Sequence, residues 1–431
     1  MRFVYQNTEL ERELDGATTP DALEAVFQKI AQIPRLFRTP AIYGQKLFAK
    51  GFDALIPRVA ARLRLEDQPS PPKSNDNVCI LATRFYPSGG HTRVAQDIIG
   101  RLQPAGVSTV LTDITDELRY RPLLNQATNQ TFLGERALVL LSSKLLVERV
   151  LETYMILKAM RPSRIVLMSH PMDIVAVLAA WPFRDIVEFV HHADHIPSLG
   201  ATLPFSAHAD LTYTCHLACR EAGLDAVYAG MTAPTAQPTT PLTPKTGLRI
   251  ATCGVIHKYQ GKGRYRWADY AVAALRQPGV ELVHIGSTDE AFQNELRNAL
   301  GAAKISLDRY ILAGFQPNLP AELGKWEADI YLSSYPEPGG KANLEAMSAG
   351  VPTIVPIDAN LPPLIRYRLP MPHWVTVNRP DRLGDAIAEV QRLAATMGET
   401  ERTIIAREAI RFDDFAAGRR PPGTPEGDRL P

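Results

Sequence analysis

The stretch EPGGKANLE in the C-terminal half places two glutamates, Glu337 and Glu345, on either side of a glycine turn. An apolar run precedes the turn and a helical pattern follows it, which predicts a strand, a loop and a helix. Glycine lets the backbone approach a ligand closely, and unpaired amides at a helix N-terminus favour phosphate or sugar oxygens. We therefore expect both carboxylates to face one ligand, with backbone contacts from Gly339 and Gly340 and a phosphate contact from Lys341.

The elements that must position these residues alternate between short apolar runs and helical runs, in two blocks. The blocks cover 77–230 and 247–400, and proline-rich stretches at 66–76 and 232–247 precede them as linkers. Fully apolar strands separated by helices are typical of a parallel sheet buried on both faces. We predict an α/β protein of two Rossmann-like parallel-sheet domains facing a cleft, which is where open sheets of this kind bind ligands.

Segments outside the two blocks complete the predicted organisation. Residues 1–66 predict a helical N-terminal extension, and residues 401–431 a closing helix followed by a disordered tail. Within the first block we expect strands at 186–190 and 211–213, among others.

At this point the stretch 330–355 resembles the C-terminal domain of the retaining GT-B glycosyltransferases of the group 1 type. That family carries two glutamates at this spacing, followed by Ala-Met-x-x-Gly-x-Pro. The matching residues here are Glu337, Glu345, Ala346, Met347, Gly350 and Pro352. The segment LAGF at 312–315 resembles a further family segment upstream. The chain departs from the family where PGGK replaces the common Gly-Phe-Gly-Leu, which leaves the identity of the sugar open.

The resemblance implies transfer of a sugar from a nucleoside-diphosphate donor to a hydroxyl acceptor, with retention and with no cofactor required. In the family the second glutamate hydrogen-bonds the nucleotide ribose, and the first contacts the donor sugar. These roles fall on Glu345 and Glu337. The resemblance implies a glycan, a lipid-linked molecule or a protein as acceptor, and a role in bacterial surface-glycan synthesis. The competing interpretation is a solvated loop residue and a helix-cap partner.

A second glycine turn, SGGHTRV at 88–94, follows the first strand of the first block. In the enzymes that the chain resembles, such a loop contacts donor phosphates or the acceptor through backbone amides, so Gly89 and Gly90 are candidate binding residues. For His91 and Arg93 a solvated first helical turn is the alternative.

The cluster HHADH follows the strand at 186–190. In related retaining enzymes a histidine at this place touches the donor sugar, and either His191 or His192 fits. Imidazoles and a carboxylate at short spacing also bind zinc. A metal site that includes Asp194 and His195 is therefore an alternative interpretation of this cluster. No fourth ligand is evident, and we predict no metal. Simple packing is the third interpretation.

Cations should neutralise the leaving diphosphate, and the loop CGVIHKYQGKGRYRW at 253–267 supplies them. Resemblance to the family favours Lys258 and Lys262, and a solvated basic loop is the alternative. The residues Ser169, His170 and Asp173 lack the sequence context of a hydrolase nucleophile, and we set that class aside. A GT-B-fold sugar-nucleotide epimerase and a non-catalytic nucleotide-binding protein are the remaining alternatives.

The composition limits the partners. The 431 residues carry 47 Lys+Arg against 46 Asp+Glu, a net charge of +1, which argues against nucleic acid. Four scattered cysteines without a C-x-x-C indicate a reducing compartment. The N-terminus shows no secretory signal and no apolar run is long enough to span a bilayer. We expect a cytoplasmic protein, working at the inner face of the membrane if the acceptor is lipid-linked.

An amphipathic stretch at 43–65 bears on that membrane contact. It places Phe48, Phe52 and Val59 near one face and several cations at the remaining positions. Such a stretch is a candidate for docking on an anionic surface. Because Pro57 interrupts the helix and the apolar face is modest, we favour packing against the first domain.

Overall fold

The computed structural model describes most of the chain, and all structural statements below concern the described residues. These are 3–37, 44–65, 77–86, 90–102, 106–113, 137–233, 247–260, 263–358, 375–419 and 421, with side chains at 395–402 left aside. The predicted disordered tail lies almost wholly outside them.

The first block forms a seven-stranded sheet in which every neighbouring pair is parallel. Its strands are β1 (Val78–Ala82), β2 (Val107–Leu111), β3 (Ala137–Leu140), β4 (Arg164–Met168), β5 (Val187–His191), β6 (Ala207–Asp210) and β7 (Val227–Tyr228). They lie in the order β3-β2-β1-β4-β5-β6-β7. The order reverses between β1 and β4, and such a reversal opens a crevice at the carboxyl ends of these strands.

Helices cover both faces of this sheet, as its buried strands require. They are α5 (Gly90–Arg101), α7 (Leu146–Met160), α8 (Ile174–Ala180) and α9 (Tyr213–Glu221), with a 3-10 turn at Trp181–Ile186. Strand side chains alternate between the faces. Cys79 and Leu81 pack with α7 and α8, whereas Ile80 and Ala82 pack with α5.

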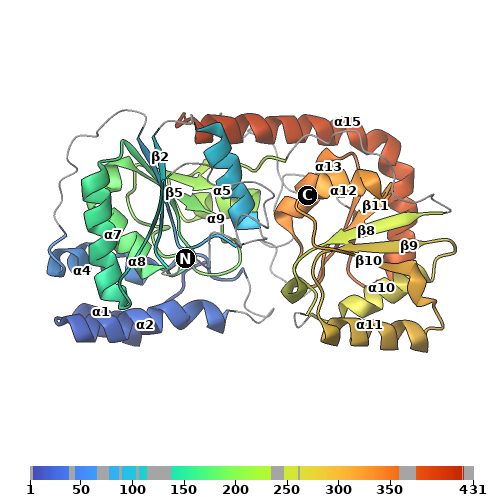
Figure 1. Ribbon diagram of the computed structural model, residues 1–431, viewed down its shortest axis with the longest axis horizontal. Coiled ribbons are helices and arrows are strands. Elements are labelled where there is room, and N and C mark those ends of the chain that lie inside the picture. The colour runs from blue at the N-terminus through green and yellow to red at the C-terminus, as the bar shows by residue number, and fades with distance from the viewer. Residues whose placement is uncertain are drawn as a thin grey trace.

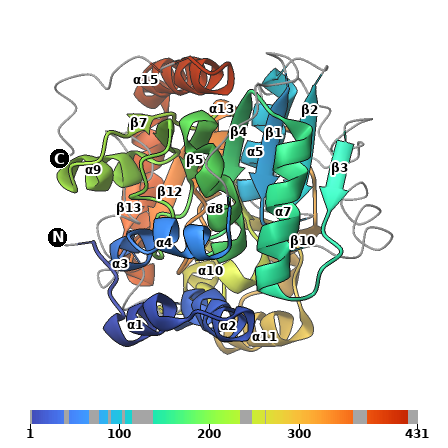
Figure 2. The ribbon, with the colours of Figure 1, turned by 90° about the vertical axis from the view of Figure 1, so that its left-hand side faces the viewer.

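The N-terminal helices pack against α7 and α8 on one side of the same sheet, and the first two, α1 and α2, lie lowest of these helices in Figure 2. They are α1 (Thr8–Gly16), α2 (Pro20–Leu36), α3 (Lys50–Asp53) and α4 (Ile56–Arg62). Phe48, Phe52 and Val59 are fully buried in the core that the sheet shares with α7 and α8. The packing that we favoured for 43–65 is therefore present, and a membrane contact by this stretch would have to use its cations.

The second block forms a six-stranded sheet, again parallel throughout. Its strands are β8 (Arg249–Cys253), β9 (Glu281–Ile285), β10 (Tyr310–Gly314), β11 (Ile330–Leu332), β12 (Thr353–Pro356) and β13 (Val375–Val377). The order β10-β9-β8-β11-β12-β13 repeats the arrangement of the first sheet, with its reversal between β8 and β11. Its helices are α10 (Trp267–Leu275), α11 (Glu290–Ala302), α12 (Leu319–Lys325) and α13 (Gly340–Ser348), with 3-10 turns at Ile256–Lys258, Leu307–Arg309 and Pro380–Arg382.

A single long helix, α15 (Leu383–Ala416), joins the two lobes along one side (Figure 1). Leu383 and Val390 pack in the second core, and Phe412 packs in the first. At its far end Arg164 donates to the carbonyls of Phe415 and Ala416, both at 2.7 Å. The domain boundary that the sequence places at 400 falls inside this helix, which continues through it without a break.

The predicted strand at 211–213 is wrong. The strand is β6, at Ala207–Asp210, and α9 already begins at Tyr213. The apolar pattern misses β6 because two of its inward residues, His208 and Asp210, are polar yet buried. Their polar atoms bond to each other and to neighbouring side chains, so this strand needs no apolar signature.

Candidate active site where the two sheets meet

The glycine turn of the second sheet lies at its point of reversal. The loop after β11 carries Glu337, and Gly339 then caps α13, which begins at Gly340. The first helical bond of α13 runs from the Asn343 amide to the Gly339 carbonyl at 3.0 Å. Helix geometry therefore leaves the preceding amides without acceptors inside the helix, and amides in this position favour an anionic or sugar oxygen.

Lys258 supplies positive charge at the same place. It ends the short turn after β8, and its carbonyl lies 3.4 Å from the Glu337 amide. A Cβ built on Gly339 would lie 3.2 Å from the Lys258 Nζ, so the ammonium group lies against the start of α13. A cation beside helix amides is suited to binding a diphosphate.

Glu345 lies one turn further along α13. Burial raises the pKa of its carboxyl, while the positive charges of Lys341 and Arg93 work against that rise. Its charge also contributes to the high pKa of the Cys253 thiol, which burial and Glu345 raise to about 12. Because Cys253 ends β8, Glu345 stands at the crevice between β8 and β11.

The two lobes contact each other directly beside this loop. The Lys341 ammonium donates to the Asp97 carboxylate of α5 at 2.5 Å and to the carbonyl of Thr232. Arg93 of α5 donates to the carbonyl of Pro317 in the second lobe. A Cβ on Gly90 would lie 3.6 Å from the Lys341 Cβ, so the start of α5 faces the start of α13. The Lys341 ammonium is thus paired with Asp97 of the first lobe. It would have to break this ion pair to bind a phosphate.

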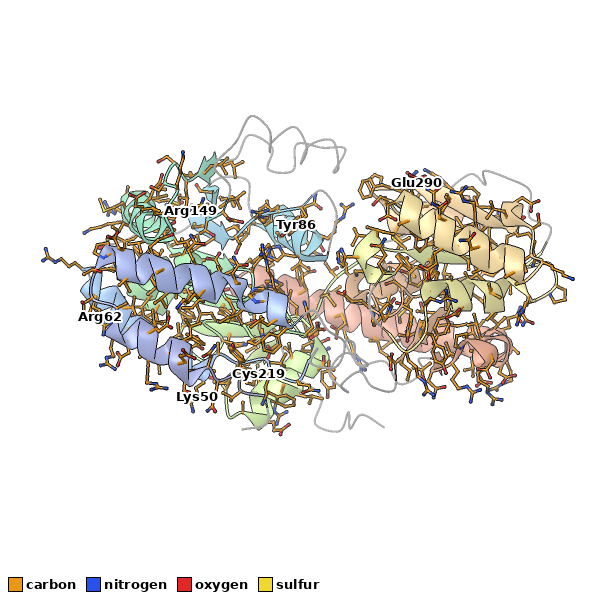
Figure 3. The ribbon with its side chains drawn as sticks, turned by 90° about the horizontal axis from the view of Figure 1, so that it is seen from below. Lys50, Arg62, Tyr86, Arg149, Cys219 and Glu290 are labelled. Carbon is orange, nitrogen blue, oxygen red and sulfur yellow. The ribbon has the colours of Figure 1, made fainter. Side chains whose placement is uncertain are left out.

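Three histidines form the facing edge of the first sheet. His91 follows β1, His170 follows β4 and His192 follows β5, all at carboxyl ends. The ring centroids of His91 and His192 are 4.4 Å apart, and those of His91 and His170 are 5.1 Å apart. The His170 ring stacks on Tyr86, which lies on the side of this lobe that faces the other one (Figure 3).

These imidazoles are neutral. Burial lowers the pKa of His91 to about 4, although its bond to the Met168 carbonyl opposes the shift. Burial, with the charges of His91 and Arg84, lowers the pKa of His170 to about 3. Burial and the neighbouring histidines likewise hold the pKa of His192 well below its usual value. Near neutral pH, this edge offers uncharged donors and acceptors.

The structure separates the two adjacent candidates His191 and His192. Successive strand residues point to opposite faces, and His191 points away from His91 toward β6. Its side chain is fully buried, and its Nδ1 lies 3.0 Å from the Asp210 Oδ1. His191 therefore cannot reach a ligand at this edge, and the candidate that remains there is His192.

Other predicted residues stand elsewhere. Gly89 and Lys262 lie outside the described residues. Arg266, from the basic loop, pairs with Asp269 at 2.8 Å and is turned toward α10. Asp173, of the hydrolase-like trio, caps α8 by accepting from the Ala176 amide at 3.0 Å.

Sequence reasoning missed His170 as a member of the site. A signal was present, because His170 follows a strand in the same way that His192 follows the next one. In a parallel sheet with β4 beside β5, the two must come close.

Two Rossmann-like parallel sheets with facing carboxyl edges, joined by a helix that returns to the first lobe, define the GT-B fold. Solved structures of that fold are similar to the chain. A lipopolysaccharide outer core galactosyltransferase, WaaB, matches with a TM-score of 0.52 and 16% identity, over 79% of this chain and 99% of that one. A glycosyltransferase of Rickettsia africae matches with a TM-score of 0.55 and 12% identity, over 80% and 99%.

The Anabaena protein Alr3699/HepE, crystallised with UDP-glucose, matches with a TM-score of 0.55 and 14% identity, over 79% of this chain and 98% of that one. No protein-family model and no curated protein sequence matches the chain. At such low identities, the structural matches establish the fold. Among the described residues, no helix is both long and apolar enough to cross a membrane.

Proposed function

We propose that the chain is a glycosyltransferase that moves a sugar from a nucleoside-diphosphate donor to a hydroxyl acceptor. The observation that carries the proposal is the Glu337–Glu345 loop and helix, with the Lys258 ammonium at its start, opposite the neutral histidine edge. The motif resemblance and the GT-B fold support it. So do the complexes of Alr3699/HepE with UDP and UDP-glucose, which concern that protein.

Each element then has a role in donor binding. Glu345 accepts hydrogen bonds from the nucleotide ribose, and Glu337 with the Gly339 and Gly340 amides contacts the sugar. Lys258 pairs with the diphosphate, with help from Gly90 across the interface and from the loop residues Gly89 and Lys262. His192 contacts the donor sugar from the opposite lobe. Lys341 holds the lobes together through Asp97.

The reaction breaks the bond between the anomeric carbon and the diphosphate oxygen, and that oxygen keeps the electron pair. The acceptor hydroxyl oxygen forms the new bond to the anomeric carbon, and its proton passes to the departing phosphate. Negative charge grows on the diphosphate during this step. A fixed ammonium and fixed amides stabilise it because they need no reorganisation when the charge develops.

Finer features rest on the resemblance. They are retention of configuration at the anomeric carbon and a hexosyl donor. They also include an acceptor that is a glycan, a lipid-linked molecule or a protein, and a role in surface-glycan synthesis. The proposed division of the chain is an extension at 1–66, an acceptor-side domain at 77–230, a donor domain at 247–400 and a closing segment at 401–431. The last two now share α15.

A nucleotide-release assay tests the proposal. The full chain is incubated with UDP-, GDP-, ADP- and dTDP-hexoses, with and without a glycan acceptor mixture, and released nucleoside diphosphate is measured. We expect one donor to be consumed, faster with acceptor. We also expect Glu337→Gln to slow release by about 100-fold or more, because it removes a contact to the reacting sugar.

The matched control is Glu290→Gln, an exposed glutamate at the start of α11, which should leave release unchanged. Isomerisation of a donor without nucleotide release would instead indicate an epimerase. If no donor binds or reacts, the transferase proposal fails.

A further inference from the structure

A buried cluster of two imidazoles, a carboxylate and a thiol lies in the first lobe, on the face of β5 opposite to that of His192. It joins His191 of β5, His208 and Asp210 of β6, and Cys219 of α9. All four are buried, and one ligand atom from each lies within 4.8 Å of every other. Figure 3 shows Cys219 on α9 within this lobe. Neither the fold nor the proposed sugar transfer requires such a group.

The distances in this cluster match those around a tetrahedral zinc ion. Zinc lies about 2.0–2.1 Å from nitrogen and about 2.3 Å from sulfur, so a tetrahedron separates nitrogen from sulfur by about 3.6 Å. The Cys219 Sγ lies 3.6 Å from the His191 Nδ1 and 3.6 Å from the His208 Nε2. It lies 3.3 Å from the Asp210 Oδ1.

The distances between the carboxylate oxygen and the two imidazole nitrogens also agree with zinc coordination. The Asp210 Oδ1 lies 3.0 Å from the His191 Nδ1 and 3.1 Å from the His208 Nε2. A tetrahedral zinc ion separates such atoms by about 3.3 Å. These two distances are therefore shorter than those of a zinc site by only a few tenths of an ångström.

Hydrogen bonds to Asp210 satisfy the two imidazoles but account for only part of this arrangement. Both imidazoles and the thiol approach a single oxygen, the Asp210 Oδ1, whereas the other carboxylate oxygen lies 3.5 Å from the His216 Nδ1. A network of hydrogen bonds would use both oxygens. Four ligand atoms of these types, all within 4.8 Å of one another, are typical of a metal site. His216 then becomes the outer partner that orients a metal-bound carboxylate.

We propose that His191, His208, Asp210 and Cys219 bind a structural zinc ion. Two imidazoles, a carboxylate and a thiolate suit zinc, a borderline ion that prefers four ligands and tetrahedral geometry. Binding replaces the proton on the Cys219 sulfur with the ion and releases that proton to solvent. With four protein ligands and complete burial, the ion has no open position for substrate. It ties the carboxyl ends of β5 and β6 to α9, directly beside His192.

The metal content of the full chain, purified without a polyhistidine tag from zinc-supplemented medium, tests the proposal. We expect about one zinc ion per chain by elemental analysis, because the site holds one tetrahedral ion. Replacing zinc by Co²⁺ should produce the near-ultraviolet band of a cobalt–thiolate bond. Cys219→Ser should lose that band, whereas Cys215→Ser, one turn earlier on the same helix, should keep it.

If Cys219→Ser fails to fold, a second measurement on the unmodified chain tests whether Cys219 binds zinc. In the unmodified chain, alkylation of Cys219, mapped by mass spectrometry, should be slow with zinc and should accelerate when a chelator removes the ion. The proposal is overturned if the folded chain retains no zinc and gains no cobalt–thiolate band. It is equally overturned if a chelator leaves alkylation of Cys219 unchanged. These readouts need no sugar donor, so they stand or fall independently of the transferase proposal.

Discussion

The first and second sheets share one strand order, yet the residues at their points of reversal differ in kind. The second sheet presents Lys258, Glu337 and Glu345 around a glycine-capped helix. The first presents His91 and His192, with His170 beside them, all with lowered pKa values. One edge is charged and the other is neutral.

This difference shows how one architecture can be used for two tasks. The topology fixes where a ligand can bind, at the carboxyl ends of the central strands. The side chains decide which part of the ligand binds to which edge. Under the proposed function, the diphosphate binds the cation and the helix amides of the second lobe, and the sugar contacts the uncharged imidazoles of the first. Predictions follow from treating the edges as chemically distinct.

The largest effect should come from removing the cation of the charged edge. Lys258→Met should lower the rate of sugar transfer by about 10²–10³-fold, because one fixed donor to the leaving diphosphate is lost. Steady-state kinetics with the donor that the nucleotide-release assay identifies measure this. Lys144→Met, an exposed lysine of the first lobe, is the control and should react normally. Equal rates for Lys258→Met and the unmodified chain would remove Lys258 from the mechanism.

The neutral edge should make the protein sensitive to acid. His91 has a pKa of about 4 in the folded chain against an ordinary 6.5, so the unfolded chain binds more protons between these values. Its contribution to stability is complete above pH 6.5 and is lost as the pH falls toward 4, by up to about 3 kcal/mol.

His91→Gln tests this, because an amide can still donate to the Met168 carbonyl but does not titrate. Urea unfolding between pH 4 and 7 gives the free energy of unfolding at each pH. We expect the variant to lose less stability on acidification than the unmodified chain. Identical pH dependence in both would show that His91 does not remain neutral.

The smallest effect should come from His192. His192→Ala should slow transfer by about tenfold, because it removes one neutral hydrogen bond to the sugar. Binding of the nucleoside diphosphate without a sugar should not change. Calorimetry with the diphosphate alone and kinetics with the sugar nucleotide separate the two. If His192→Ala weakens diphosphate binding as much as it slows transfer, His192 contacts the nucleotide. The two edges would then not bind different parts of the donor.

Much of the fold can be predicted from the sequence, because a buried strand is recognisable as a short apolar run. β1, β2, β4, β8 and β9 are short, mostly apolar runs, and parallel sheets follow from the helices between them. β6 escaped prediction because its polar residues satisfy one another inside the protein. Local patterns carry no information about such mutual pairing.

The candidate site likewise has one part that the sequence predicts and another that depends on the tertiary structure. The Glu337–Glu345 motif is contiguous, so its spacing alone predicts that loop and helix bring the two glutamates to one ligand. The assembly of His91, His170 and His192 depends on which strands are neighbours, and their pKa shifts depend on burial. The pairing of Lys341 with Asp97 depends on how the lobes meet, which no local pattern encodes.

Nucleotide binding to the charged edge tests the central claim most directly. Calorimetric titration of the full chain with UDP, GDP, ADP and dTDP should identify at least one ligand. Glu345→Gln should raise its dissociation constant by about 10–100-fold, since it weakens a charged hydrogen bond to the ribose, whereas Glu290→Gln and His192→Ala should not. If no diphosphate binds, or if Glu345→Gln binds it as tightly as the unmodified chain, the second lobe is not the nucleotide site.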